Sequence, residues 1–92
     1  MIALVTGAGS GIGAAIAERL AADGHRVAVN DLSLSAAQKT VDVIRANGGL
    51  AHAYEADVSD TAAVDAMVDQ MREDLGAPDI LVNNAGFGHQ PR

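Results

Sequence analysis

Short apolar runs rich in β-branched residues alternate along the chain with longer, Ala-rich stretches in which apolar side chains recur every three or four positions. The short runs predict four strands, at residues 2–6, 26–31, 50–55 and 79–83. The longer stretches predict three helices, one at 11–23, one from 35 up to the glycines at 48 and 49, and one from a cap at 59 or 60 up to Gly76. Strands that alternate with helices in this way predict an α/β fold with a parallel sheet.

The apolar positions also predict which side chains face the sheet. The expected inward stripes are Ile12, Ile16 and Leu20 in the first helix, Ala37, Val41 and Ile44 in the second, and Val64, Val68, Met71 and Leu75 in the third. Ser35, followed three residues later by Gln38, is a capping-box signature for the second helix. The uninterrupted apolar run at 80–82 predicts a strand that is buried on both faces.

Right-handed crossovers between parallel strands predict the order 3-2-1-4 for this sheet. The first two helices are then expected on one face and the third on the other. With 92 residues the chain holds one small domain, in which residues 1–86 form the ordered unit and residues 87–92 a tail. Strand four is left at an edge, where no Lys or Glu interrupts its apolar run, so we expect self-association through this edge.

Composition narrows the possible functions. The net charge is −6 and the six basic residues form no run, which argues against binding along a nucleic-acid backbone. The chain has no Cys, and its three histidines (His25, His52 and His89) are scattered, which argues against a metal site. No basic leader and no apolar run near the length of a membrane span are present, so we expect a cytoplasmic protein without a membrane partner.

A glycine-rich segment joins the first predicted strand to the first predicted helix. It reads T-G-A-G-S-G-I-G over residues 6–13 and supplies the candidate site residues Gly7, Ala8, Gly9, Ser10, Gly11, Ile12 and Gly13. Its spacing fits T-G-x-x-x-G-x-G rather than G-x-G-x-x-G, and no Lys follows, so a Walker A phosphate loop is excluded. At this place a helix N-terminus can meet a dinucleotide pyrophosphate, although a tight strand-to-helix turn alone would also use glycine.

Asp31 ends the second predicted strand, 18 residues after Gly13. This is close to the offset at which a carboxylate accepts hydrogen bonds from the hydroxyls of an adenosine ribose. The same carboxylate would repel a ribose 2′-phosphate, and no Arg or Lys lies in the glycine loop or directly after Asp31. The sequence therefore favours NAD over NADP, with a simple strand-end role for Asp31 as the alternative.

Two further segments follow strands three and four: Asp57 with Val58, and the run Asn83, Asn84, Ala85 and Gly86. With the glycine loop and Asp31, they make the chain resemble the N-terminal part of the short-chain dehydrogenase/reductase family. The resemblance implies a Rossmann-type sheet that binds NAD(H). It further implies that Asp57 contacts the adenine amino group beside the Val58 backbone, and that Asn84, with Ala85 and Gly86, supports the loop and lines the cofactor site. Asn is also common in turns, so a purely structural turn is the alternative interpretation of Asn83 and Asn84.

The family's catalytic residues have no counterpart in this sequence. They are a Ser and a Tyr-x-x-x-Lys pair, whereas Tyr54, the single Tyr, is followed at position 58 by Val, and Lys39, the single Lys, lies in the second predicted helix. The chain resembles about half of the family fold. A truncated gene product, a deliberately produced fragment and one piece of an interrupted reading frame are all compatible with it.

Three functions follow from these residues. The first is the NAD(H)-binding part of an oxidoreductase that acts on alcohol or carbonyl groups, without catalytic activity in this chain alone. The second is a stand-alone module that binds an adenine nucleotide. The third is an inert fragment that folds only by association.

Overall fold

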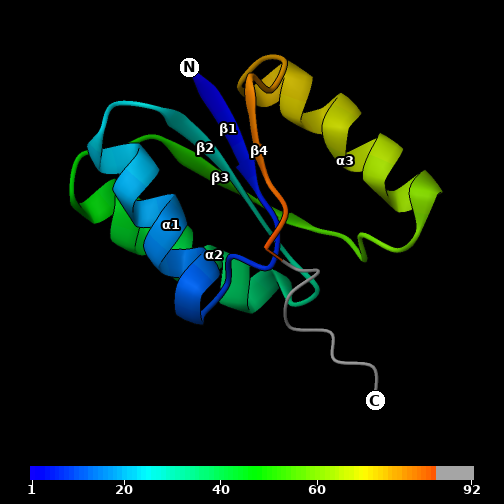
Figure 1. Ribbon diagram of the computed structural model, residues 1–92, viewed down its shortest axis with the longest axis horizontal. Coiled ribbons are helices and arrows are strands. Elements are labelled where there is room, and N and C mark those ends of the chain that lie inside the picture. The colour runs from blue at the N-terminus through cyan, green and yellow to red at the C-terminus, as the bar shows by residue number, and fades with distance from the viewer. Residues whose placement is uncertain (85–92) are drawn as a thin grey trace.

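The computed structural model describes residues 1–84 (Figure 1). The elements along the chain are β1 (Ile2–Val5), α1 (Gly11–Ala22), β2 (Arg26–Asp31), α2 (Leu34–Ala46), β3 (Ala51–Glu55), α3 (Thr61–Asp74) and β4 (Ile80–Val82). All seven predicted elements are present, with ends that differ by one or two residues. Ala85, Gly86 and the predicted tail lie outside the described residues.

The four strands form one parallel sheet in the order β3-β2-β1-β4, as predicted. Figure 1 shows α1 and α2 on one side of this sheet and α3 on the other. The predicted Rossmann-type arrangement, with two helices on one face and the third on the opposite face, is therefore confirmed. In this arrangement the carboxyl ends of all four strands point to the same edge.

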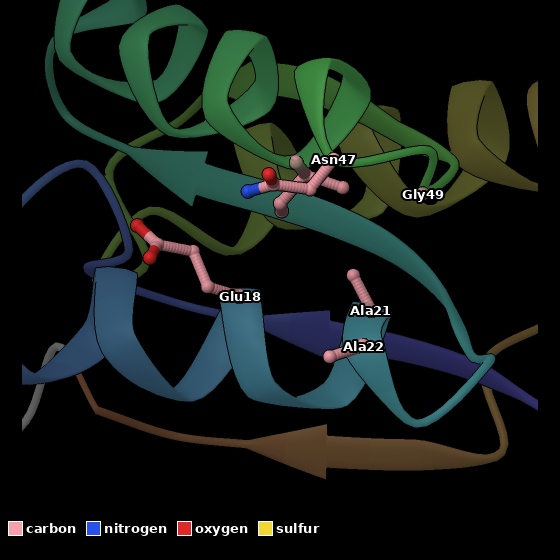
Figure 2. Close-up of a pocket in the computed structure, with 6 residues that line it drawn as sticks. Glu18, Ala21, Ala22, Asn47 and Gly49 are labelled. Carbon is pink, nitrogen blue, oxygen red and sulfur yellow. The ribbon is translucent and has the colours of Figure 1, made fainter.

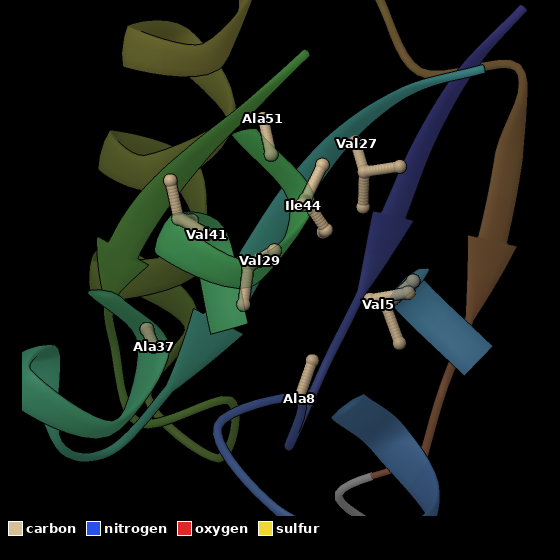
Figure 3. Close-up of a cluster of buried hydrophobic side chains, with 9 residues drawn as sticks. Val5, Ala8, Val27, Val29, Ala37, Val41, Ile44 and Ala51 are labelled. Carbon is tan, nitrogen blue, oxygen red and sulfur yellow. The ribbon is translucent and has the colours of Figure 1, made fainter. Parts of the chain in front are cut away.

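The core beneath α1 and α2 consists of small aliphatic side chains (Figure 3). Val27 and Val29 of β2 point to this side, because alternate residues of a strand face alternate sides of a sheet. Ala37, Val41 and Ile44 pack on them from α2 and are at most 2% exposed, as predicted. Small side chains let the helices approach the sheet closely.

The predicted stripe of α1 is wrong in one position. Ile12 is 74% exposed, whereas Gly13 and Ala17 are the buried residues of this helix. Ile16 and Leu20 are partly buried against the same core. The side of α1 that packs closest to the rest of the molecule carries the small residues Gly13 and Ala17. A prediction from the spacing of large apolar residues therefore placed Ile12 incorrectly.

The N-terminal cap of α2 is Ser33 rather than Ser35. The Ser33 hydroxyl oxygen accepts from the N–H of Ala36 at 3.2 Å, while Gln38 donates to Asp42 instead of to the helix start. The physical reason is Asp31, whose carboxylate accepts from the N–H of Ser33 at 3.1 Å and turns the chain two residues earlier than expected. Asp60 caps α3, as one of the two predicted options, and accepts from the N–H of Ala63.

The second core, beneath α3, uses larger side chains. Leu4, Ala28 and Tyr54 of the sheet pack against Met67 and Met71 of the helix. The predicted stripe included Met71 and Leu75, which are buried, but it named Val68 where Met67 is the buried residue.

The prediction that β4 is buried on both faces is wrong. Leu81 is 66% exposed, and Ile80 and Val82 are only half-buried. Leu81 pairs in register with Leu4 and so points to the α3 side. Because α3 packs on β1, β2 and β3 rather than on β4, Leu81 lies beyond the area that the helix covers.

Candidate cofactor site

The candidate site residues gather at the carboxyl edge of the sheet. The glycine loop follows β1, Asp31 ends β2, Asp57 and Val58 follow β3, and Asn84 follows β4. The order of the strands brings these four segments side by side, although they span the whole described chain.

The glycines of the loop serve two different purposes. Gly7 and Gly11 have φ angles of 62° and 58°, in the left-handed region that favours glycine. Gly9 and Gly13 are needed for space instead, because a Cβ on Gly9 would lie 2.6 Å from the Ala36 Cβ. A Cβ on Gly13 would collide with the Gly7 carbonyl and with the Asn84 side chain. The close neighbours of Gly13 are therefore the loop itself and Asn84, which follows β4.

Side chains from two other strand ends hold the backbone of the loop. The Asn84 amide donates to the Gly7 carbonyl at 3.1 Å. The N–H of Gly9 donates to the Asp31 carboxylate at 2.9 Å. The loop is therefore bound to the ends of both β2 and β4, and its shape is fixed by the protein itself.

The first turn of α1 offers hydrogen-bond donors. In the described part of the chain, the N–H groups of Gly11, Ile12 and Gly13 form no hydrogen bond, and the first helical bond is donated by Ala14. No acidic side chain lies in this turn, and the Ser10 side chain does not cap it. Unpaired N–H groups and the positive end of the helix dipole suit an anion such as a phosphate.

Asp31 contacts the same loop, at Gly9, and has a structural role as well. One carboxylate oxygen accepts from Gly9 and the other from Ser33, so the alternative strand-end role is realised in the structure. Each carboxylate oxygen has two lone pairs, which leaves acceptor capacity for further donors. Asp31 is half-buried and thus still accessible from the edge.

The turn after β3 presents Asp57 at the surface. Its Oδ1 accepts from the N–H of Ser59 at 2.9 Å and from the Ser59 hydroxyl at 2.7 Å. Beside it, Val58 is half-buried. At the end of β4, the Asn83 side chain oxygen accepts from the Thr6 hydroxyl at 3.3 Å. Asp57 with Val58 and Asn83 with Asn84 thus directly follow β3 and β4, at the edge where the strands end.

Sequence reasoning missed Thr40 and Asn30, which are 3% and 1% exposed. The Thr40 hydroxyl donates to the Ala8 carbonyl at 2.8 Å, and the Asn30 amide donates to the Tyr54 and Ala56 carbonyls. A signal for Thr40 was present, because positions 37, 40, 41 and 44 all fall on one helical face. The prediction kept only the apolar members of that face.

Tyr54 is the penultimate residue of β3, and its side chain packs in the core beneath α3. Its hydroxyl donates to the Asp74 carboxylate at 2.7 Å. Burial first, and then the hydrogen bond and the negative charge of Asp74, raise the pKa of Tyr54 far above its usual range. The same hydrogen bond lowers the pKa of Asp74. Tyr54 is therefore a protonated, structural residue at neutral pH.

The rest of the described chain contains a cavity, but no candidate metal cluster and no candidate membrane span. Residues 1–84 contain no cluster of three side chains that could hold a metal ion, and none of their helices is long and apolar enough to cross a membrane. A cavity of about 160 Å³ opens between the C-terminal parts of α1 and α2 (Figure 2). Its lining residues are Glu18, Ala21, Ala22, Ile44, Asn47 and Gly49. The cavity lies at the opposite end of α1 from the glycine loop.

Comparison with known proteins gives the family. The chain is 48% identical over 88 residues to the uncharacterized oxidoreductase YxbG of Bacillus subtilis (strain 168), covering 96% of this chain and 32% of that protein. It superposes on a hydroxysteroid dehydrogenase from Escherichia coli with a TM-score of 0.87 and 41% identity, over 89% of this chain and 35% of the other. A 7α-hydroxysteroid dehydrogenase in complex with NADH and 7-oxo glycochenodeoxycholic acid gives a TM-score of 0.86 and 41% identity, over 89% and 32% of the two chains.

The chain spans about a third of the length of each of these three proteins. The family model of the short chain dehydrogenases matches it over residues 1–92. On the strength of this match, and of a parallel sheet whose glycine loop, Asp31 and Asn84 meet at one edge, the chain belongs to the short chain dehydrogenase family.

Proposed function

We propose that this chain is the NAD(H)-binding part of an oxidoreductase that acts on alcohol or carbonyl groups. The observation that carries the proposal is the first turn of α1, whose three unpaired backbone N–H groups follow directly after the loop that Gly9 binds to the Asp31 carboxylate, at the edge where four strands end. Donors for a diphosphate and an acceptor for a ribose are the two groups that an adenine dinucleotide needs. The NADH complex of the similar 7α-hydroxysteroid dehydrogenase supports this assignment.

Each candidate residue has a proposed place around the cofactor. Residues 7–13 hold the diphosphate through the N–H groups of the loop and of α1, and Asp31 accepts from the adenosine ribose. Asp57 and the Val58 backbone face the adenine, and Asn84, with Ala85 and Gly86, lines the site after β4. When bound, the cofactor supplies or accepts the hydride, while the residues of this chain bind and orient it.

NAD is the proposed cofactor rather than NADP. Asp31 would place its negative charge against a ribose 2′-phosphate, and the next residue, Leu32, is apolar and 61% exposed. Neither residue can neutralise the additional 2′-phosphate of NADP. We further propose that the chain alone has no dehydrogenase activity, since Tyr54 is engaged with Asp74 and the family's Tyr-x-x-x-Lys pair has no counterpart in the sequence.

Cofactor binding can be tested by thermal unfolding of the chain with NAD, NADP, AMP and no ligand. A ligand that binds only the folded state at 100 times its Kd stabilises it by about 2.7 kcal/mol. We expect NAD to raise the Tm more than NADP does. Asp42→Asn is a matched control for Asp31→Asn, because Asp42 lies on the exposed side of α2 and contacts only Gln38. Stabilisation by AMP and not by NAD would favour the stand-alone nucleotide module, and no stabilisation by any ligand would favour the inert fragment.

Activity is tested separately by following NADH formation with a panel of alcohols at saturating NAD. General acid–base groups typically contribute about 10² to 10⁴-fold to a rate, so we expect no turnover above background. Turnover that survives Tyr54→Phe and Lys39→Ala would contradict the proposal that catalytic groups are missing.

A second copy of the chain is the proposed partner of β4. This strand is the edge of the described sheet, carries no charged residue, and exposes Leu81 at its centre. Two identical edges related by a two-fold axis can pair antiparallel, with each Leu81 against the other copy. Light scattering at tens of micromolar should show a dimer or larger species, and Leu81→Lys should shift it toward monomer. A monodisperse monomer for the unchanged chain would contradict this proposal.

A further inference from the structure

Ala8 is held by the rest of the molecule at both of its backbone polar groups. Its N–H donates to the Asn30 carbonyl at 2.8 Å, and its carbonyl accepts from the Thr40 hydroxyl at 2.8 Å. Ala8 itself is completely buried. It is the point at which the glycine loop enters the interior of the protein.

Thr40 is a buried polar residue on an otherwise apolar helix face. It is 3% exposed and lies on the same side of α2 as Ala37, Val41 and Ile44. A hydroxyl in such surroundings is unfavourable unless it is hydrogen-bonded, and its bond goes to the loop. A valine would fill the same space without this requirement, so packing alone does not account for a threonine.

The same helix touches the loop at the next residue. A Cβ on Gly9 would lie 2.6 Å from the Ala36 Cβ, and the Gly9 N–H donates to Asp31. The N–H donors of α1 begin two residues further along. A loop released from Thr40 would therefore move both Gly9 relative to Asp31 and the first turn of α1.

We propose that Thr40 is a positioning residue for the glycine loop, and through it for the diphosphate of the cofactor. The proposal rests on the proposed cofactor function of this edge. Thr40 makes no contact with the ligand in this scheme. It acts from the interior by fixing the Ala8 carbonyl, and with it the direction of the N–H groups that follow.

The variants that test this are Thr40→Val, which keeps the shape and removes the hydroxyl, and Thr40→Ser, which keeps the hydroxyl. Val41→Ala is the matched control, since Val41 is the next residue on the same helix, fully buried, and lies outside the hydrogen bonds of the loop. Affinities for NAD and for adenosine are measured by calorimetry at a temperature where circular dichroism shows each variant folded.

We expect Thr40→Val to weaken NAD binding about tenfold, because a displaced loop would lose the equivalent of one hydrogen bond to the diphosphate. The affinity for adenosine, which has no phosphate, should fall less than twofold in Thr40→Val. Thr40→Ser should bind NAD as tightly as the unchanged chain. Val41→Ala should lower the Tm and leave the affinity for NAD within twofold. Equal affinity of Thr40→Val and the unchanged chain, or an equal loss in Val41→Ala, would overturn the proposal.

A measurement without ligand separates this proposal from the proposed function. Amide hydrogen exchange in the unliganded chain should be faster at Ala8 and Gly9 in Thr40→Val, while Val29 in the middle of β2 is unchanged. If the unchanged chain binds no NAD but exchange responds in this way, the cofactor function fails and the positioning role of Thr40 stands. If exchange at Ala8 does not respond, the positioning role fails whatever the chain binds.

Discussion

The cores on the two faces of the sheet differ in the size of their side chains and in how much of the sheet they cover. Beneath α1 and α2, the nine buried residues of the core are at most 2% exposed and are mostly Ala and Val. Beneath α3, the core uses Met, Tyr and Leu and ends before β4, where Leu81 is 66% exposed. The first face also contains the contacts of Ala8 and Gly9 with α2. The fully buried core therefore lies on the face that holds the glycine loop, whereas the core on the opposite face leaves β4 uncovered.

The largest combined effect, on stability and on cofactor binding together, is expected from Gly13→Val on the first face. The new side chain would collide with the Gly7 carbonyl and with Asn84, so we expect a loss of about 3 kcal/mol in unfolding free energy together with the loss of NAD binding. Denaturant unfolding and calorimetry measure the two quantities. Ala15→Val, at an exposed position of the same helix, should cost less than about 1 kcal/mol. Unchanged stability with lost binding would show that Gly13 matters for the ligand alone.

Substitution of Leu4 and of Leu81 compares the part of the sheet that α3 covers with the part that it leaves uncovered. They are register partners on neighbouring strands, yet Leu4 is 5% exposed and Leu81 is 66% exposed. Leu4→Ala should cost about 2–5 kcal/mol, and Leu81→Ala about 0.5 kcal/mol or less. Both are read from urea unfolding at a concentration where the chain is monomeric. Similar losses for the two variants would mean that something covers Leu81.

Cofactor choice is expected to respond to a change at the end of β2. Asp31→Ala combined with Leu32→Arg removes the repulsion of a 2′-phosphate and adds a cation, so the ratio of the NAD and NADP affinities should shift toward NADP by at least about tenfold. Calorimetry with both cofactors measures the ratio. The substitution also removes the acceptor of Gly9 and Ser33, so Asp31→Ala alone is the control for a general loss of loop order. Equal binding of NAD and NADP by the unchanged chain would contradict the role of Asp31.

The smallest effect concerns pH and the α3 face. Because the pKa of Tyr54 is raised in the folded state, the unfolded chain loses its proton first as the pH rises above about 10. The stability from Tyr54 is then fully present below pH 10 and falls above it by up to about 1.4 kcal/mol per pH unit. Urea unfolding between pH 9 and 11 should show this slope in the unchanged chain and a smaller one in Tyr54→Phe. Parallel slopes in both would disprove the assignment.

The sequence predicted the fold more fully than the details of its packing. Strand order followed from the β-α-β pattern and from the single handedness of its crossovers, which local residues suffice to specify. Leu81 was misplaced because its burial depends on how far α3 extends over the sheet. Ile12 and Met67 were misplaced because tertiary packing decides which side of a helix faces the sheet, and the period of the apolar residues does not contain that information.

The sequence indicated where the candidate site residues lie in the fold, but not the hydrogen bonds that hold them. Glycine spacing and Asp31 identified the edge, because those residue types are tied to local backbone geometry and charge. The bonds from Asn84 to Gly7 and from Thr40 to Ala8 join residues 77 and 32 positions apart, which a single sequence does not reveal. The double use of Asp31, toward Gly9 and Ser33, is likewise visible only after folding.

The strand order has a consequence for folding during synthesis. The pairing of β1 with the edge strand β4 joins residues near the two ends of the described chain, such as Leu4 and Leu81. At about 5–20 residues per second, a ribosome would complete β4 roughly 4–16 s after β1. During that interval one edge of the apolar strand β1 has no partner, and pairing over such a separation is slow. The nascent chain thus leaves one side of an inner strand of its sheet unpaired for seconds, and we expect a chaperone to bind there.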